Sequence, residues 1–231
     1  MNGNNGDIEI LMFPGWGFNA DSWKIWDAFL EPDYKLKKFE PGYFGSERRV
    51  KFSGLHNRLN VIFAHSFGLH QCSPEQLRRA DLLVIFSGFI HFHPRAKQYR
   101  RRSRLVVHQM INKLEEYPRK VLEDFMDNCY HPEPADPSIP KNSINKQRLL
   151  SDLKCLNSEQ LNVELLNYIP SICILHGRED AIVPNKKGRE LYESISVQGH
   201  YYEIHQAGHA LPFTHTQMCW SFIKPIIENF D

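Results

Sequence analysis

Short apolar segments alternate along the chain with stretches whose apolar residues recur at helical spacing. Six segments are predicted to be strands: 8–13, 34–39, 59–64, 82–86, 171–175 and 201–205. Most of these strands carry almost continuous apolar side chains, which is typical of parallel strands covered by helices on both faces. The fold class predicted is therefore α/β, with a mostly parallel sheet flanked by helices.

The segment 94–167 interrupts this alternation and contains no convincing strand. Helical spacing is visible in 105–114, in 121–126 and from 147 to 166, and the region between the last two is rich in proline. These prolines are Pro132, Pro134, Pro137 and Pro140. We interpret 94–167 as an inserted helical cap, with 1–93 and 168–231 together forming the α/β core.

Composition excludes several classes of protein. The 231 residues suit one domain with an insertion, and 28 basic against 27 acidic residues are unlike a disordered polyelectrolyte or a uniformly basic nucleic-acid binder. No apolar run reaches the roughly 18–20 residues of a membrane span, and the polar start, 1–7, does not resemble a signal peptide. The five scattered cysteines indicate neither a disulfide framework nor a zinc site. We expect a cytoplasmic monomer that binds no nucleic acid, membrane, metal or cofactor.

A candidate nucleophile follows the third predicted strand. Ser66 lies between His65 and Phe67, with the small residues Ala64 and Gly68 two positions away on either side. A serine on a sharp turn from strand to helix exposes its hydroxyl only if these flanking positions are small. The pattern predicts a nucleophile elbow, although a serine before a helix can also be a simple N-cap.

Two later strand ends carry the groups that a serine nucleophile needs. Asp180 follows the strand 171–175, and His209 follows the strand 201–205. A serine hydroxyl attacks a carbonyl only when an imidazole accepts its proton, and the imidazole needs a carboxylate to fix its tautomer. Because active sites of α/β proteins lie at the carboxyl ends of the strands, we expect Ser66, His209 and Asp180 to form a catalytic triad.

An oxyanion hole is expected from two further positions. The turn that contains Trp16 follows the first strand between two glycines, so the Trp16 N–H can point at a developing oxyanion, with the Phe67 N–H as the second donor. His65 is expected to line the mouth of the substrate site rather than to transfer protons.

The order Ser66, Asp180, His209 is that of the α/β-hydrolase superfamily, which the chain resembles over nearly its whole length. Its segments 15–23, 41–46, 64–68, 180–184 and 209–215 resemble those of pimeloyl-[acyl-carrier protein] methyl ester esterases of biotin synthesis. The resemblance implies a serine esterase with Ser66 as nucleophile, His209 as base and Asp180 as acid, and with no cofactor. It also implies a methyl ester on a carrier-bound acyl chain as substrate.

The cap carries a local excess of positive charge. Between residues 95 and 124 nine basic residues stand against four acidic ones. This excess is a solvated helix face or a surface that attracts an acidic partner. Nucleic-acid binding is a third interpretation, which is disfavoured because one short basic cluster contains no recognisable binding motif. Since acyl carrier proteins are strongly acidic, the resemblance favours a carrier-binding surface that includes Arg100, Arg101, Arg104 and Lys120.

Other functions remain open from the sequence. A triad does not reveal the leaving group, so a thioesterase, a lactonase or a hydrolase of carbon–carbon bonds is an alternative to an esterase. A non-catalytic ligand-binding protein of the same fold is a second alternative. His91 and His93 could face the same side as a metal pair, but no third ligand is evident, so we expect no metal site.

Overall fold

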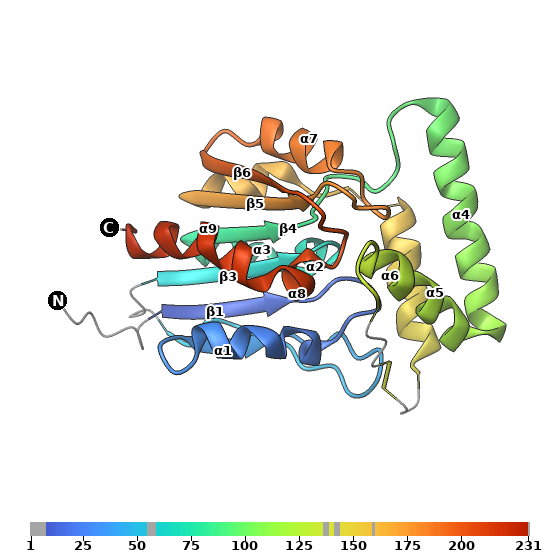
Figure 1. Cartoon of the computed structure of the whole chain (residues 1–231), viewed down its shortest axis with the longest axis horizontal. Helices are drawn as coiled ribbons and strands as arrows, with labels where there is room; N and C mark the ends of the chain where they lie inside the picture. Colours follow the sequence, from blue (N-terminus) through green and yellow to red (C-terminus); the bar gives the residue numbers. More distant parts are fainter. Residues whose placement is uncertain (1–7, 55–58, 136–138, 141–143, 159, 231) are drawn as a thin grey trace.

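The computed structural model describes residues 8–54, 59–135, 139–140, 144–158 and 160–230 (Figure 1). The polar start, 1–7, and Pro137 of the proline-rich segment lie outside these ranges.

In the described part of the chain the sheet has six strands in the order β2-β1-β3-β4-β5-β6, and every neighbouring pair is parallel. The strands are β1 (Ile8–Phe13), β2 (Lys35–Lys38), β3 (Leu59–His65), β4 (Leu82–Phe86), β5 (Ser171–Gly177) and β6 (Gln198–Ile204). All six predicted strands are present, within a few residues of the expected bounds. The prediction of a parallel α/β sheet is confirmed.

Both faces of the sheet are covered, which explains the continuous apolar runs. Along β1, Ile10 and Met12 pack into the cluster on one face, and Leu11 and Phe13 pack into the cluster on the other. The first face is covered by a 3-10 helix (Ala20–Trp26), α1 (Asp27–Leu30), α8 (Leu211–Thr214) and α9 (Thr216–Glu228). The second face is covered by α2 (Gly68–Gln71), α3 (Pro74–Arg79), a 3-10 helix (Val163–Tyr168) and α7 (Lys186–Ser194).

Three helices follow β4 and lie beyond the carboxyl ends of the strands (Figure 1). They are α4 (Lys97–Glu116), α5 (Pro118–Tyr130) and α6 (Lys146–Ser158), called the cap helices below. A third hydrophobic cluster joins these helices to Trp16 and Phe67 of the core. The Trp16 indole N–H also donates a buried hydrogen bond of 2.9 Å to the carbonyl of Leu149 on α6. The cap helices are therefore fixed directly over the edge of the sheet where catalytic groups are expected.

The end of the inserted segment differs from the expectation. The periodicity predicted helix from 147 to 166, whereas α6 ends at Ser158 and a separate 3-10 helix begins at Val163. Leu161 and Leu166 pack in the cluster on the second face of the sheet, away from the cap helices. Residues at the end of the predicted cap thus contribute to the core, because their apolar side chains face α3 and the sheet rather than α4 and α5.

No helix among the described residues is long and apolar enough to cross a membrane. The described residues also contain no group of three or more His, Cys, Asp or Glu side chains that could hold a metal ion.

Candidate active site

Ser66 lies on a tight turn between β3 and α2. Its φ is +53°, in the left-handed region that side-chain-bearing residues rarely adopt. A Cβ at Gly68 would lie 2.4 Å from the Phe13 carbonyl oxygen, so only glycine fits there. A Cβ at Gly15 would lie 3.1 Å from Ser66 Cβ, which shows how closely the turn after β1 approaches the serine. Gly68, one of the two small residues that flank Ser66 in the sequence, is therefore required by close backbone packing.

His209 connects Ser66 to a buried carboxylate. The Ser66 hydroxyl donates to Nε2 of His209 over 2.9 Å, and Nδ1 of His209 donates to Oδ2 of Asp180 over 2.8 Å. His209 is 1% exposed and the Asp180 side chain is fully buried. The structure thus brings together the three side chains that the sequence selected, in the order that proton transfer from serine to imidazole needs.

Asp180 is held rigidly by the turn that follows β5. Its Oδ1 accepts hydrogen bonds from the backbone N–H groups of Ile182 (2.9 Å) and Val183 (2.7 Å). Burial acts to raise the pKa of Asp180, but attraction to His209 and hydrogen bonds from His176 and His209 outweigh it and hold the pKa well below its usual range. The carboxylate is therefore charged at neutral pH and can stabilise an imidazolium.

His176, at the end of β5, is a member of the site that we did not predict. Its ring is fully buried, and Nε2 lies 2.7 Å from the carbonyl oxygen of Val183 and 3.3 Å from Oδ2 of Asp180. Because a carbonyl oxygen only accepts, Nε2 carries the proton, which also lies close to the carboxylate. One feature of the sequence could have pointed to His176: it is a histidine at the end of a predicted strand, four residues before Asp180.

The two expected oxyanion donors lie beside Ser66. Within the described residues, neither the Trp16 N–H nor the Phe67 N–H donates a hydrogen bond to another group of the protein. Trp16 and Ser66 line the same cavity, and Phe67 directly follows the nucleophile. Neither amide is therefore engaged by an acceptor among the described residues, as an oxyanion donor requires.

His65 does not line the substrate site, which corrects our expectation. It is fully buried, it contacts the rings of Phe18 and Phe213, and its Nε2 donates to the His209 carbonyl oxygen over 3.0 Å. The reason is strand alternation, since His65 points to the same face of the sheet as Phe63. Through its hydrogen bond to the backbone of His209, His65 helps to hold the segment that carries the triad histidine.

A cavity of about 470 Å³ extends from Ser66 between the sheet edge and the cap helices, and we call it the catalytic cavity. Its walls are mainly apolar, with side chains from all three cap helices, among them Val107, Phe125 and Leu153. Arg102, Lys186 and Lys187 also line it, and the described residues that line it include no Asp or Glu. A cavity of this size and character suits an apolar small molecule or acyl chain.

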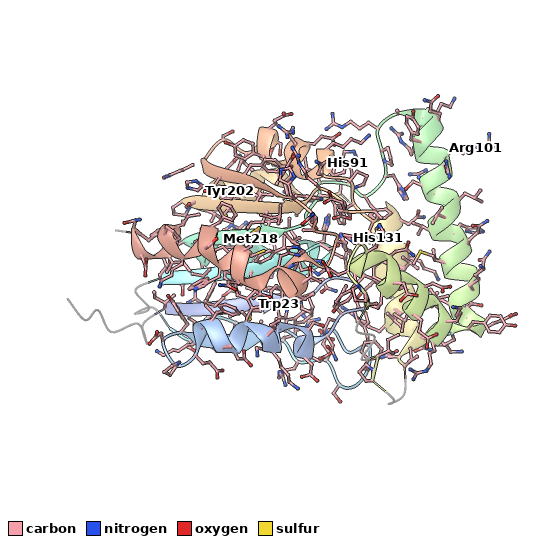
Figure 2. The ribbon with its side chains drawn as sticks, in the orientation of Figure 1. Trp23, His91, Arg101, His131, Tyr202 and Met218 are labelled. Atoms are coloured by element: carbon pink, nitrogen blue, oxygen red, sulfur yellow. The ribbon has the colours of Figure 1, made fainter. Side chains whose placement is uncertain are left out.

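The four basic residues expected to bind a carrier do not form one surface. Arg100, Arg101 and Arg104 lie in the first two turns of α4, whereas Lys120 lies on α5, beyond the far end of that helix. At ~1.5 Å per residue the intervening part of α4 separates them by roughly 20–25 Å. Lys120 also pairs with Asp124 at 2.8 Å. Figure 2 shows Arg101 on the side of α4 remote from the core.

His93, one of the two histidines considered as a metal pair, has another role. Nδ1 of His93 lies 2.8 Å from the Ser103 hydroxyl, and Nε2 lies 2.9 Å from the side-chain oxygen of Asn157. Both ring nitrogens of His93 are therefore occupied by hydrogen bonds to α4 and α6, and the imidazole joins the loop after β4 to the cap helices.

Comparisons with known proteins define the fold. No protein-family model matches the chain, and no curated protein matches its sequence. Among solved structures, the esterase EaEST from Exiguobacterium antarcticum superposes with a TM-score of 0.79 and 15% identity, covering 97% of this chain and 93% of the esterase. The chain has the α/β-hydrolase fold.

Further solved structures extend the comparison with the α/β-hydrolase fold. A bromoperoxidase from Bacillus anthracis has a TM-score of 0.76 and 15% identity, over 97% of this chain and 92% of that chain. The hydrolase olei00960 from Oleispira antarctica has a TM-score of 0.74 and 14% identity, over 96% and 91%. At these identities the likeness concerns the fold, so any activity must be argued from the site itself.

Proposed function

We propose that this α/β-hydrolase-fold chain is a serine hydrolase that cleaves carboxylic esters. The observation that carries the proposal is the continuous hydrogen-bonded chain from Ser66 through His209 to Asp180, located at one end of an apolar cavity. A merely structural serine would not need a strained backbone, a neighbouring imidazole and a buried carboxylate at the same point.

The geometry suits acyl transfer in two steps. In the first step Ser66 Oγ attacks the ester carbonyl while His209 Nε2 accepts the hydroxyl proton, and Asp180 stabilises the resulting imidazolium. The Trp16 and Phe67 N–H groups stabilise the oxyanion, and His209 returns the proton to the departing alcohol. In the second step water attacks the acyl-enzyme, again with His209 as base, and the acid is released.

For the substrate, we propose an ester whose acyl chain occupies the catalytic cavity. More narrowly, we propose the methyl ester of pimeloyl-[acyl-carrier protein], which rests on the sequence resemblance and on the basic side chains in the first turns of α4. Thioesters, lactones and cleavable carbon–carbon bonds can use the same triad. The leaving group must therefore be determined with matched substrates that share one acyl chain.

Hydrolysis of p-nitrophenyl butyrate tests the proposed reaction. We expect Ser66→Ala to lower kcat by roughly 10⁴–10⁶ while leaving the fold intact. Ser87→Ala is the matched control, because Ser87 also follows a strand with a φ of +50° but is fully buried. Undiminished hydrolysis by Ser66→Ala, or absence of hydrolysis by the wild type with any ester of a broad panel, would contradict the proposal.

A genetic experiment tests the narrower substrate. We expect the chain to restore biotin-free growth to a bacterial strain that lacks its pimeloyl-carrier methyl esterase, and Ser66→Ala to fail. Ester hydrolysis in vitro without rescue of growth would leave the serine esterase in place and exclude this substrate.

A further inference from the structure

Helix α6 of the cap contacts both segments that supply the expected oxyanion donors. Leu149 and Asp152 are buried on this helix, and residues three positions apart on a helix share a face. Trp16, in the turn after β1, donates a hydrogen bond to Leu149, and Gln71, on α2, donates one to Asp152. One face of a single cap helix therefore holds two segments of the core that are distant in the sequence.

The link to the first donor is made by the Trp16 side chain. Its indole N–H donates to the Leu149 carbonyl oxygen over 2.9 Å, and both residues are buried. The rings of Trp16 and Phe125 on α5 meet edge to face, with their centroids 4.9 Å apart. A backbone N–H whose own side chain is fixed in this way has little freedom to turn aside. The position of the Trp16 N–H therefore depends on the cap helices.

The link to the second donor is made through α2. Phe67 directly precedes this helix, and its carbonyl oxygen accepts a 2.9 Å hydrogen bond from the N–H of His70. Gln71 is the last residue of α2, and its side-chain N–H donates to Oδ2 of Asp152 over 3.1 Å. Because α2 is a single turn, a contact at its last residue restrains the whole turn. Asp152 therefore restrains the segment that presents the Phe67 N–H.

Asp152 is a buried carboxylate with several partners. The Tyr43 hydroxyl donates to its Oδ2 over 2.7 Å, and Nε of Arg148 lies 3.2 Å from the same oxygen. Burial and the charge of Asp152 hold the pKa of Tyr43 well above its usual range, so the hydroxyl keeps its proton and remains a donor. Since a buried polar network is costly to break, these contacts fix α6 firmly against the core.

We propose that α6 positions the oxyanion hole, acting on α2 through the Asp152 carboxylate and on Trp16 through the Leu149 carbonyl group. Asp152 is not among the residues that line the catalytic cavity, so it is a positioning residue and not a catalytic one. Oxyanion donors act mainly in the transition state, so their misplacement lowers kcat and changes KM little. The inference rests on the proposed function, because it requires an oxyanion to form at Ser66.

Substitutions at Asp152 separate its hydrogen bonds from its volume. Asp152→Leu keeps a similar size but accepts no hydrogen bond, and we expect kcat for p-nitrophenyl butyrate to fall roughly 10–100-fold at nearly constant KM. Asp152→Asn retains an oxygen that can accept from Tyr43 and Gln71, so it should keep most of the activity. Gln71→Met removes only the donor on α2, and kcat should fall by about tenfold. Because Gln71 is only half-buried, this variant provides the test if Asp152→Leu does not fold.

Asn157 provides a matched control on the same helix. Its side-chain oxygen lies 2.9 Å from Nε2 of His93, so it also joins α6 to the rest of the protein. Its partner belongs to the loop after β4, which supplies neither of the expected oxyanion donors. Asn157→Leu should therefore leave kcat close to the wild-type value. A loss as large as that in Asp152→Leu would show that any weakening of the cap lowers activity, and it would overturn the proposal.

Amide hydrogen exchange measures the positioning without turnover. The N–H groups of Phe18, Leu69 and His70 donate hydrogen bonds within the two segments, to Gly15, Ser66 and Phe67 respectively. We expect these three amides to exchange faster in Asp152→Leu than in the wild type and in Asn157→Leu.

The outcomes separate this inference from the proposed function. If the wild type hydrolyses esters and both Asp152→Leu and Gln71→Met keep its kcat, the proposal is overturned and the esterase stands. A fall in kcat that Asp152→Asn shares in full would also overturn it, since the hydrogen bonds would then not be the cause. Faster exchange of the three amides in Asp152→Leu, when the wild type hydrolyses no ester, would support the hold of α6 on both segments and contradict the proposed reaction.

Discussion

Nε2 of His176 lies 3.3 Å from Oδ2 of Asp180 and 2.7 Å from the carbonyl oxygen of Val183, so one buried ring nitrogen contacts both ends of the turn that holds the triad carboxylate. The same carboxylate accepts the hydrogen bond of His209. The orientation of the base therefore depends on a turn that is fixed by backbone amides on one side and by His176 on the other.

Removing the His176 donor should impair catalysis more than binding. His176→Phe keeps an aromatic ring at this position but removes the N–H that Val183 and Asp180 share. We expect kcat to fall roughly 10–100-fold, because a small misplacement of a catalytic group has an effect of this size. KM should change little. His176→Gln, which can still donate, should recover part of the loss. Steady-state kinetics, with urea unfolding as a check on the fold, measures both. A rise in KM at constant kcat would show that His176 has no positioning role.

Asp180 and its neighbour Glu179 provide a matched pair of carboxylates. Asp180→Asn should lower kcat at neutral pH by about 10⁴, because the amide favours the wrong tautomer of His209. Glu179→Gln should leave kcat nearly unchanged, since Glu179 is exposed and takes no part in the hydrogen bonds that join Ser66, His209 and Asp180. Ester hydrolysis by both variants checks the ranking, and the reverse ranking would mean that Glu179 is the triad acid.

The fold and the three triad positions could be predicted because both depend on strands. Continuous apolar runs mark strands buried on two faces, and Ser66 and Asp180 each follow such a run, whereas His209 follows the half-buried edge strand β6. The burial of His65 was also within reach, because alternation along β3 places it on the same face as Phe63.

Contacts that depend on how separate elements dock could not be predicted. The sequence shows that Arg100 and Arg104 share a helix face, but not that this face meets the loop carrying Arg95. Likewise, the hydrogen bond between His176 and Val183 requires the conformation of the turn after β5, and the separation of Lys120 from the arginines requires the length of α4.

Gly15 offers a test of the turn that presents the Trp16 amide. In Gly15→Ala the new Cβ would lie 3.0 Å from Nδ1 of His65 and 3.1 Å from Cβ of Ser66, so the turn must move away from the nucleophile. We expect kcat to fall by about tenfold or more, because oxyanion donors act only at close range. Gly45→Ala is the control, since a Cβ there would meet nothing within 4 Å. Equal activity of the two variants would argue against an oxyanion donor in this turn.

His70 predicts a pH dependence of stability. Burial lowers its pKa to about 4, compared with ~6.5 in an unfolded chain. Between these values the unfolded chain binds a proton that the folded protein does not, so the free energy of unfolding falls as the pH falls, by about 1.4 kcal/mol per pH unit. This contribution is fully present above about pH 6.5. Urea unfolding from about pH 7 to 4.5 should show a shallower dependence for His70→Gln than for the wild type. Identical slopes would contradict the lowered pKa.

Covalent labelling followed by peptide mass spectrometry tests whether Ser66 is the activated nucleophile. A fluorophosphonate should form a single adduct on the wild-type protein, located on the peptide that contains Ser66. The adduct should form far more slowly in His209→Gln, because the serine then lacks its base. A single adduct at Ser66 is the expected result. An adduct on another serine, or no adduct on a protein that hydrolyses esters, would contradict the assignment of Ser66 as the nucleophile.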